Sequence, residues 1–439
     1  MLVLLEESRM FQTERSRADV SREDALILVC ARLSLTSDQR LALGSILRDR
    51  ELSWQEVLKK ARWHRLTGFL YHHLRDPQFA DAVPSWVRDK LEKTYFRNGL
   101  RNRLFQVELN RVLGVLQDAE VPIIALKGSA LLDRVYQDPS VRPMADIDLL
   151  VPEDRAEAAQ SGVVGLGYAP VASLEEQEKT RAVHRHLPKL VGPQGRIKFE
   201  IHTHIVSRDS PLRFDLSSFW QQAQAATVAG RQVQILAPHH LLIHLSIHFF
   251  LDRRFRSAQA IGQICDIAEV IGHYTDSLDW AALSEEVLAH GLSGPVHCSL
   301  SLAQELLGAP VPPEFLKRVR PAAYDTSPAR LFLRRRVLSN QRVIASQWVS
   351  PEKDYSWSNV MRGVWGRLFP GRSYLTKDYR EGQADPGAVG SYLTRLSDGG
   401  SVLKQYLFSP LDVWREIQVD RWIHSLSVGE RPSTNAGGK

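Results

Sequence analysis

The sequence predicts an α+β fold in which a small mixed sheet is flanked by helical N-terminal and C-terminal regions. Apolar residues with helical spacing dominate residues 21–120 and return from residue 237 onward. Between these regions, residues 121–236 contain short β-branched apolar runs separated by glycine-rich turns. The 439 residues, 44% of them hydrophobic and 24% charged, allow two or three domains with their own cores.

The N-terminal part is predicted to be a layer of helices. Residues 1–20 are polar and rich in charge, and we expect them to be disordered. Ser21 and Ser53 each precede a run of helical spacing, where a serine hydroxyl caps the first backbone N–H groups. The spacing over residues 85–116 predicts one or two long helices.

The central region begins with a strand, a Gly-Ser pair and a helix. Residues 121–126 form a short apolar run that ends at Gly128 and Ser129, and residues 130–136 follow with helical spacing. Backbone N–H groups at the start of a helix have no partner within the helix. A Gly-Ser pair at such a place is therefore a candidate seat for phosphate.

Two aspartates open the next apolar run. Asp146 and Asp148 flank Ile147, and the run continues over residues 149–151. Alternation along a strand places both carboxylates on one face, as a Mg²⁺ site that binds nucleotide phosphates requires. The alternative is a solvated strand end, where an isolated Asp-x-Asp is common.

A hairpin is predicted further along the central region, after a helix from residue 152 and a short strand over 168–171. Residues 174–183 are predicted to be helical, and residues 186–191 and 196–205 then form two strands joined by the turn 192–195. Alternation puts four polar side chains on one face of the second strand: Lys198, Glu200, His202 and His204. Glu200 is either a buried site residue or a glutamate on a solvated hairpin face.

The order of strand, Gly-Ser, helix, loop and Asp-x-Asp resembles the core of the nucleotidyltransferases related to DNA polymerase β. The longer string from Leu126 to Val151, with Arg142 before the aspartates, is similar to bacterial proteins described as uncharacterised nucleotidyltransferases. The similarity is most specific over residues 120–205. Ser129 and Asp146 lie 17 positions apart, which is longer than the usual gap of the superfamily, although this branch tolerates a longer loop.

The resemblance implies a role for each site residue. Asp146 and Asp148 would hold metal ions, and Glu200 matches the position of the third metal-binding carboxylate. The resemblance also implies a nucleotide-binding set, in which Gly128 and Ser129 seat phosphates, Lys127 or Arg142 offsets their charge and His248 faces the nucleotide: Lys127, Gly128, Ser129, Arg142 and His248.

Residues 237–329 are predicted to form a helical domain that contains a stripe of histidines. His240, His244 and His248 recur every four residues, so they share one helix face. The first and last lie roughly 12 Å apart along a straight helix, too far to bind one zinc ion together. A neighbouring pair with outside ligands remains an alternative, and the sequence leaves the roles of the three histidines open.

Positive charge is concentrated in the C-terminal quarter, a predicted basic helical region over 330–430 followed by a disordered tail over 431–439. Residues 330–439 contain 17 Lys and Arg against 10 Asp and Glu, whereas the rest of the chain is nearly balanced. This region is either a solvated basic surface or a site for an anionic partner, such as RNA, a lipid surface or an acidic protein.

The sequence predicts a cytoplasmic protein without a signal peptide or a transmembrane segment. Cys30, Cys265 and Cys298 are widely separated, which indicates neither a disulfide framework nor a zinc ribbon. The first residues lack a basic segment and turn acidic, and no uncharged run approaches the ~18 residues of a membrane span.

The activity that the resemblance implies is transfer of a nucleoside monophosphate from an NTP to an acceptor hydroxyl, with Mg²⁺ or Mn²⁺ and release of pyrophosphate. The acceptor is undetermined and is a small molecule, an RNA or a protein. Two rivals are a non-catalytic nucleotide-binding or interaction module and a toxin-like enzyme that modifies tRNA or protein.

Overall fold

The computed structural model describes residues 20–171, 187–195, 197–206, 210, 212, 214–252, 258–322, 324–338 and 410–428. The predictions for residues 1–19, for the helix over 174–183, for residues 339–409 and for the tail lie outside these residues. The chain divides into two compact units. The first comprises Met1–Phe250, Gln259–Pro321 and Gly429–Lys439, and the second comprises Leu251–Ala258 and Ala322–Val428.

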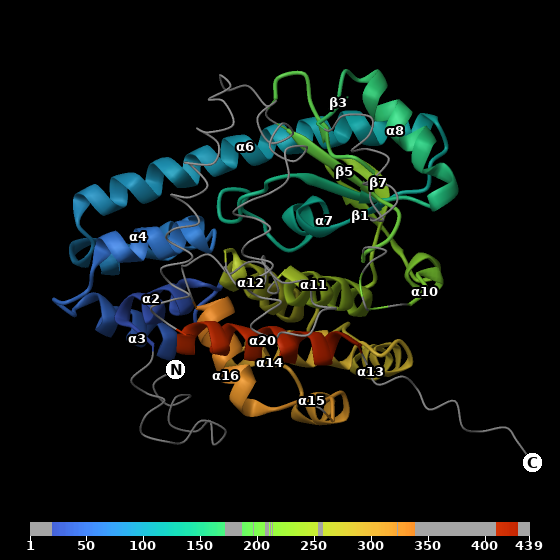
Figure 1. The fold of residues 1–439 in the computed structure, drawn as a ribbon. Coiled ribbons are helices and arrows are strands. Elements are labelled where there is room, and N and C mark those ends of the chain that lie inside the picture. Colours follow the sequence, from blue (N-terminus) through green and yellow to red (C-terminus); the bar gives the residue numbers. More distant parts are fainter. Residues whose placement is uncertain are drawn as a thin grey trace, which may run out of the picture. The chain divides into compact units, whose positions relative to one another are not determined.

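Helices form the N-terminal part of the first unit, as predicted (Figure 1). The hydroxyl of Ser21 accepts from the Asp24 backbone N–H and that of Ser53 accepts from Glu56, so both predicted caps are confirmed. Residues 85–116 belong to a single helix. The elements are α2 (Arg22–Cys30), α3 (Ser37–Leu47), α4 (Trp54–Trp63), α5 (Thr67–Leu74), the short 3-10 helix η2 (Pro77–Ala82) and α6 (Ser85–Asp118).

A mixed seven-stranded sheet follows, in the order β3-β4-β5-β2-β1-β7-β6. Its strands are β1 (Ile124–Ala125), β2 (Ile147–Leu150), β3 (Ala169–Pro170), β4 (Leu190–Val191), β5 (Lys198–His202), β6 (Gln224–Val228) and β7 (Arg231–Ile235). The predicted β4–β5 hairpin is confirmed as an antiparallel pair, and the Gly195 N–H closes its turn on Gly192. The β6–β7 hairpin is an element that the sequence analysis did not identify.

Helices cover both sides of this sheet. Figure 1 shows α6 and α8 (Ala156–Gly165) above the sheet, and α7 (Lys127–Arg134) with α11 (Pro238–Asp252) and α12 (Ala260–His273) below it. Apolar strand residues fill the interior between these layers, with Ile147, Leu149 and Phe199 fully buried. The observed architecture confirms the predicted α+β class, a mixed sheet with helical flanks.

Several predicted boundaries were wrong for local reasons. The left-handed φ of Lys127 (46°) ends the extended backbone, so α7 begins at Lys127 and not at Ala130. β2 starts at Ile147, which leaves Asp146 just before the strand. β5 ends at His202 because the Val206 N–H turns back to donate to His204 Nδ1.

Further helices complete the two units. In the first, Asp279 caps α13 (Trp280–Ala289) as expected, and α14 (Ser293–Leu307) and α15 (Pro313–Arg318) follow. The second unit contains α16 (Thr326–Phe332), a π-helical turn (Leu333–Val337) and α20 (Pro410–Val428). Among the described residues, no helix is long and apolar enough to cross a membrane.

Candidate functional site

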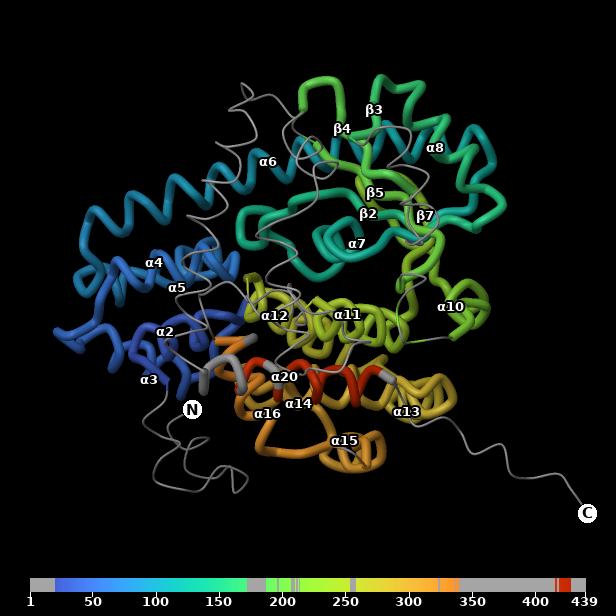
Figure 2. Tube along the Cα trace, viewed as in Figure 1, coloured from blue at the N-terminus to red at the C-terminus, as the bar shows by residue number. Residues whose placement is uncertain are grey.

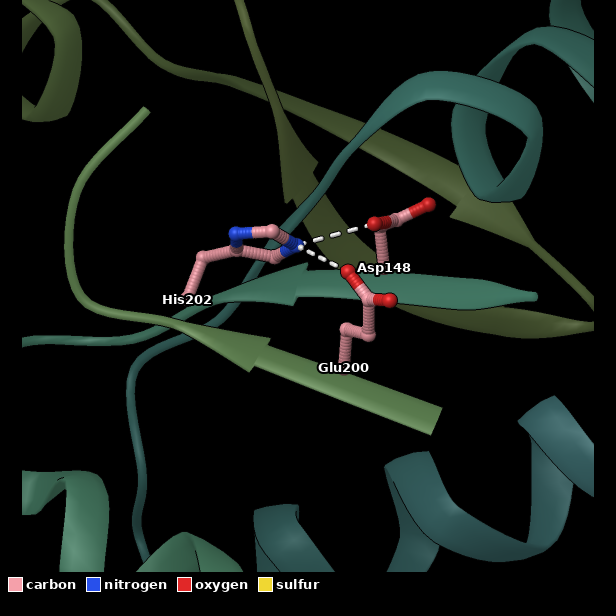
Figure 3. Close-up of side chains that lie close together, drawn as sticks. All are labelled: Asp148, Glu200 and His202. Carbon is pink, nitrogen blue, oxygen red and sulfur yellow. Dashed lines mark hydrogen bonds and ion pairs between the residues drawn. The ribbon is translucent and has the colours of Figure 1, made fainter. Parts of the chain in front are cut away.

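The pairing of β2 with β5 brings acidic residues from distant parts of the chain together. The two strands are parallel, with Asp148 opposite Glu200 and Leu150 opposite His202. Because side chains alternate along a strand, Glu200 and His202 project from the same face of β5. One ligand atom from each of Asp148, Glu200 and His202 lies within 4.8 Å of the others (Figure 3).

His202 contacts both carboxylates of this cluster. Its Nε2 lies 2.8 Å from Asp148 Oδ1 and 3.5 Å from Glu200 Oε2, the two contacts drawn in Figure 3. Asp148 is 2% exposed, so its charge is removed from water and depends on these partners. Strand alternation predicts that His202 shares the face of Glu200, but the sequence alone indicates no role for it.

Lys127 supplies a half-buried cation to the site. Its Nζ donates to Asp148 Oδ1 over 2.9 Å. The residue adopts the left-handed conformation, which costs a non-glycine residue about 1–3 kcal/mol and is retained only where the surroundings over-determine it. Lys127 therefore points into the acidic cluster, which the sequence alone left undecided.

Ser129 joins α7 to β2 from inside the core. It is 2% exposed, its hydroxyl accepts from the Asp148 backbone N–H over 3.2 Å, and its own N–H donates to the Leu126 carbonyl. One of the N–H groups that the sequence suggested for phosphate is therefore already paired. The serine aligns the helix start with the strand that presents Asp148.

Arg142 faces the first turn of α7. A Cβ built on Gly128 would lie 2.8 Å from Arg142 Nη1, so glycine at this position admits the guanidinium. The opposite edge of the guanidinium is fixed, since Nε and Nη2 donate to the two Asp266 oxygens over 2.7 and 2.8 Å. Tyr136 donates to the same carboxylate over 2.7 Å. Arg142 and Gly128 thus lie together.

Asp146 lies at the more exposed edge of the site. It is intermediate in burial, and Lys189 Nζ lies 3.9 Å from its Oδ2. Lys189 also forms an ion pair with Glu200. Lys189 could not be identified from the sequence, because its position depends on the pairing of β4 with β5 and on the hydrogen bond from Val171 N–H to its carbonyl.

The surroundings shift the pKa values of the site's ionisable groups in different directions. Burial raises the pKa of Asp146, and the negative charges of Asp148 and Glu200 raise it further. Burial also opposes ionisation of Asp148, but Lys127 and His202 outweigh it and hold the pKa of that carboxyl well below its usual range. The pKa of Lys127 is raised, since the neighbouring carboxylates outweigh its burial. A lysine–aspartate ion pair is therefore built into the site.

The histidines of α11 divide between two environments. His240 stacks on Phe219 with ring centroids 4.0 Å apart, and its Nε2 lies 3.4 Å from Glu286. Burial lowers the pKa of His244 well below its usual value, and the charge of Lys127 lowers it further. His248 is half-buried on the same helix. None of the three joins a three-donor metal cluster within the described residues.

Comparisons with known proteins identify the family of the chain. A solved structure titled as an antigenic nucleotidyltransferase-like protein from Paracoccidioides brasiliensis matches with 16% identity and a TM-score of 0.26, over 46% of this chain and 93% of that one. No functionally curated protein matches the sequence significantly. The family model described as uncharacterised nucleotidyltransferase matches residues 50–308. The chain belongs to this uncharacterised nucleotidyltransferase family, which supports a general nucleotidyltransferase activity.

Proposed function

We propose that the protein is a metal-dependent nucleotidyltransferase that moves a nucleoside monophosphate from an NTP to an acceptor hydroxyl and releases pyrophosphate. The observation that carries the proposal is the cluster of Asp148, Glu200 and His202 on adjacent strands. Asp146 stands next to it, and Lys127 and Arg142 place positive charge on either side of Gly128. This combination of charges suits a nucleoside triphosphate with its metal ion.

The donor set fits a divalent cation. Carboxylate oxygens are the preferred ligands of Mg²⁺, and a set that includes an imidazole nitrogen also suits Mn²⁺. Asp146, Asp148 and Glu200 would hold the cation, with His202 either joining them or orienting Asp148. The cation would neutralise phosphate charge and favour ionisation of the acceptor hydroxyl. Lys189, paired with Glu200 and near Asp146, would have to move aside from these oxygens.

The residues of the chain supply positioning and charge. Lys127 keeps Asp148 ionised, and Arg142, fixed by Asp266, offers its free edge to the phosphates that leave as pyrophosphate. Gly128 leaves room for that approach. In this proposal Ser129 aligns the helix start, and His248 on α11 faces the nucleotide.

The proposal is tested by incubating the full-length protein with each α-labelled NTP, Mg²⁺ or Mn²⁺, and cell extract. We expect a labelled small molecule, RNA or protein in the wild-type reaction and none with EDTA. Calorimetry should show that the divalent ion strengthens NTP binding several-fold, because two carboxylates and a triphosphate repel each other without it. Equal NTP affinity with EDTA would contradict the metal site.

The matched variant is the Asp146→Asn, Asp148→Asn pair, with Asp38→Asn as an exposed control. NTP binding should be lost in the pair and unchanged in the control. Metal–NTP binding without transfer to any acceptor would favour a non-catalytic nucleotide-binding module. A labelled tRNA or protein as product would favour the toxin-like reading of the same chemistry.

A further inference from the structure

Arg65 lies at a strained junction between two helices. It directly follows the C-cap residue of α4 and has a left-handed φ of 61°. Because this residue is an arginine and not a glycine, the left-handed conformation costs about 1–3 kcal/mol and must be held by the surrounding packing. Arg65 is half-buried, and the proposed activity assigns it no role.

Two close backbone contacts fix the position of this junction. A Cβ on Gly262 of α12 would lie 2.4 Å from the His64 carbonyl oxygen, and the Gln259 N–H donates to the Trp63 carbonyl over 2.9 Å. On the other side, a Cβ on Gly68 of α5 would lie 2.2 Å from the Val141 carbonyl oxygen. The junction of α4 and α5 is therefore wedged between the start of α12 and the loop that precedes β2 (Figure 2).

These contacts bring Arg65 beside the Arg142–Asp266 pair. Arg142 follows Val141 directly, and Asp266 lies one helical turn beyond Gly262. Burial lowers the pKa of Arg65, the positive charge of Arg142 lowers it further, and the carboxylate of Asp146 acts in the opposite direction. Arg65 is thus close enough to interact electrostatically with both Arg142 and Asp146.

The basic side chains that act on Arg65 are Arg142 and Arg101, and the acidic ones are Asp146 and Asp266. Both oxygens of Asp266 are engaged, because they accept two hydrogen bonds from Arg142 and one from Tyr136. Within the described part of the chain, the Arg65 guanidinium forms no hydrogen bond or ion pair. The guanidinium groups of Arg65 and Arg142 carry like charge and repel each other, and an anion between them would relieve this repulsion.

We propose that Arg65 and Arg142 together bind a phosphate group, with Asp266 and Tyr136 as positioning residues for Arg142. Arginine suits this task because its planar fork of donors matches phosphate oxygens. The phosphate would be either the terminal phosphate of the nucleoside triphosphate or the phosphate of a phosphorylated acceptor. The choice between these sources rests on the proposed function, whereas the phosphate site itself does not.

The test is calorimetry of the full-length protein with inorganic pyrophosphate in EDTA. We expect wild-type binding that weakens as salt is raised, and at least fivefold weaker binding for Arg65→Gln. Arg88→Gln is the matched control, since it removes the same charge from an exposed site on α6. Thermal unfolding should show that Arg65→Gln remains folded.

Arg142 must be replaced together with Asp266, because replacing Arg142 alone would leave the buried Asp266 carboxylate without its counter-charge. The Arg142→Gln, Asp266→Asn variant replaces the ion pair by two amides and should also bind pyrophosphate at least fivefold more weakly. No wild-type binding of pyrophosphate, or unchanged binding in Arg65→Gln, would overturn the site.

Competition with Mg²⁺-ATP identifies the source of the phosphate. Displacement of pyrophosphate assigns the site to the nucleotide, and simultaneous binding assigns it to a phosphorylated acceptor; either outcome supports a phosphate site. Pyrophosphate binding in a protein that transfers no nucleotide would leave this inference standing and overturn the proposed function alone.

Discussion

Asp148 and Glu200 stand directly opposite each other on the parallel strands β2 and β5. The register sets their side chains on one face of the sheet, where His202 bridges them. Lys127 and Lys189 compensate the charge of this pair from two sides. The acidic pair is therefore a product of strand pairing, and its counter-charges come from other elements.

Glu200→Gln should separate chemistry from binding. We expect the fold and most of the NTP affinity to be kept, because Asp146 and Asp148 remain and Gln conserves volume. The transfer rate should fall by roughly 10²–10⁴-fold if Glu200 helps to activate the acceptor. Single-turnover rates with labelled NTP measure this change, and the exposed Glu314→Gln serves as control. A wild-type rate in Glu200→Gln would show that the third metal-binding carboxylate is not Glu200.

Asp266 is a poor substitute for Glu200 as a metal ligand. Both of its oxygens are engaged by Arg142, and Tyr136 adds a third hydrogen bond. We expect Asp266→Asn to raise KM for the NTP more than it lowers kcat, because it loosens Arg142 without touching the cluster of Asp148. A fall in kcat with unchanged KM would contradict this positioning role.

Lys127→Met should make the protein depend on divalent metal for stability. Removing one partner of a buried ion pair typically costs about 3–5 kcal/mol, since Asp148 loses its main counter-charge. A bound divalent ion would then replace the missing charge. We expect Mn²⁺ to raise the Tm of Lys127→Met more than that of wild type. The exposed Lys59→Met should respond like wild type, and equal shifts in all three proteins would argue against a metal at Asp148.

His297 should contribute to the loss of stability in acid. Burial lowers its pKa to about 4, despite the contact of Nδ1 with the Leu316 carbonyl. The unfolded chain takes up the proton near pH 6.5, so the free energy of unfolding falls between about pH 6.5 and 4, by roughly 1.4 kcal/mol per unit. Urea unfolding of His297→Gln should show a shallower decline over this range and the wild-type slope above pH 7. An identical decline would show that His297 is protonated in the folded state.

The basic C-terminal quarter is predicted to serve the acceptor and not the nucleotide. Arg362, Arg367 and Arg372 lie outside the described residues, and their charges are far in sequence from the Asp148 cluster. Replacing all three with Gln should weaken acceptor use in a salt-dependent way and leave metal–NTP binding intact. The control replaces three exposed arginines of α6, Arg88, Arg97 and Arg103. Unchanged acceptor use in the first variant would favour a merely solvated basic surface.

The sequence by itself determined the local features of this protein. The caps at Ser21, Ser53 and Asp279 follow from side chains that accept from the N–H group three residues away. Alternation along β5 places Glu200 and His202 on one face, whichever strand pairs with β5. The turn between β4 and β5 is likewise encoded by its own glycines.

Only the tertiary structure decided which distant residues meet. The register of β2 with β5 brings Asp148 to Glu200, and the packing of α12 brings Asp266 to Arg142. The left-handed conformation of Lys127 has no signature in the sequence, since lysine seldom adopts it without support from its surroundings. Local patterns report which face a side chain occupies, whereas its charge partners depend on contacts between segments far apart in the chain.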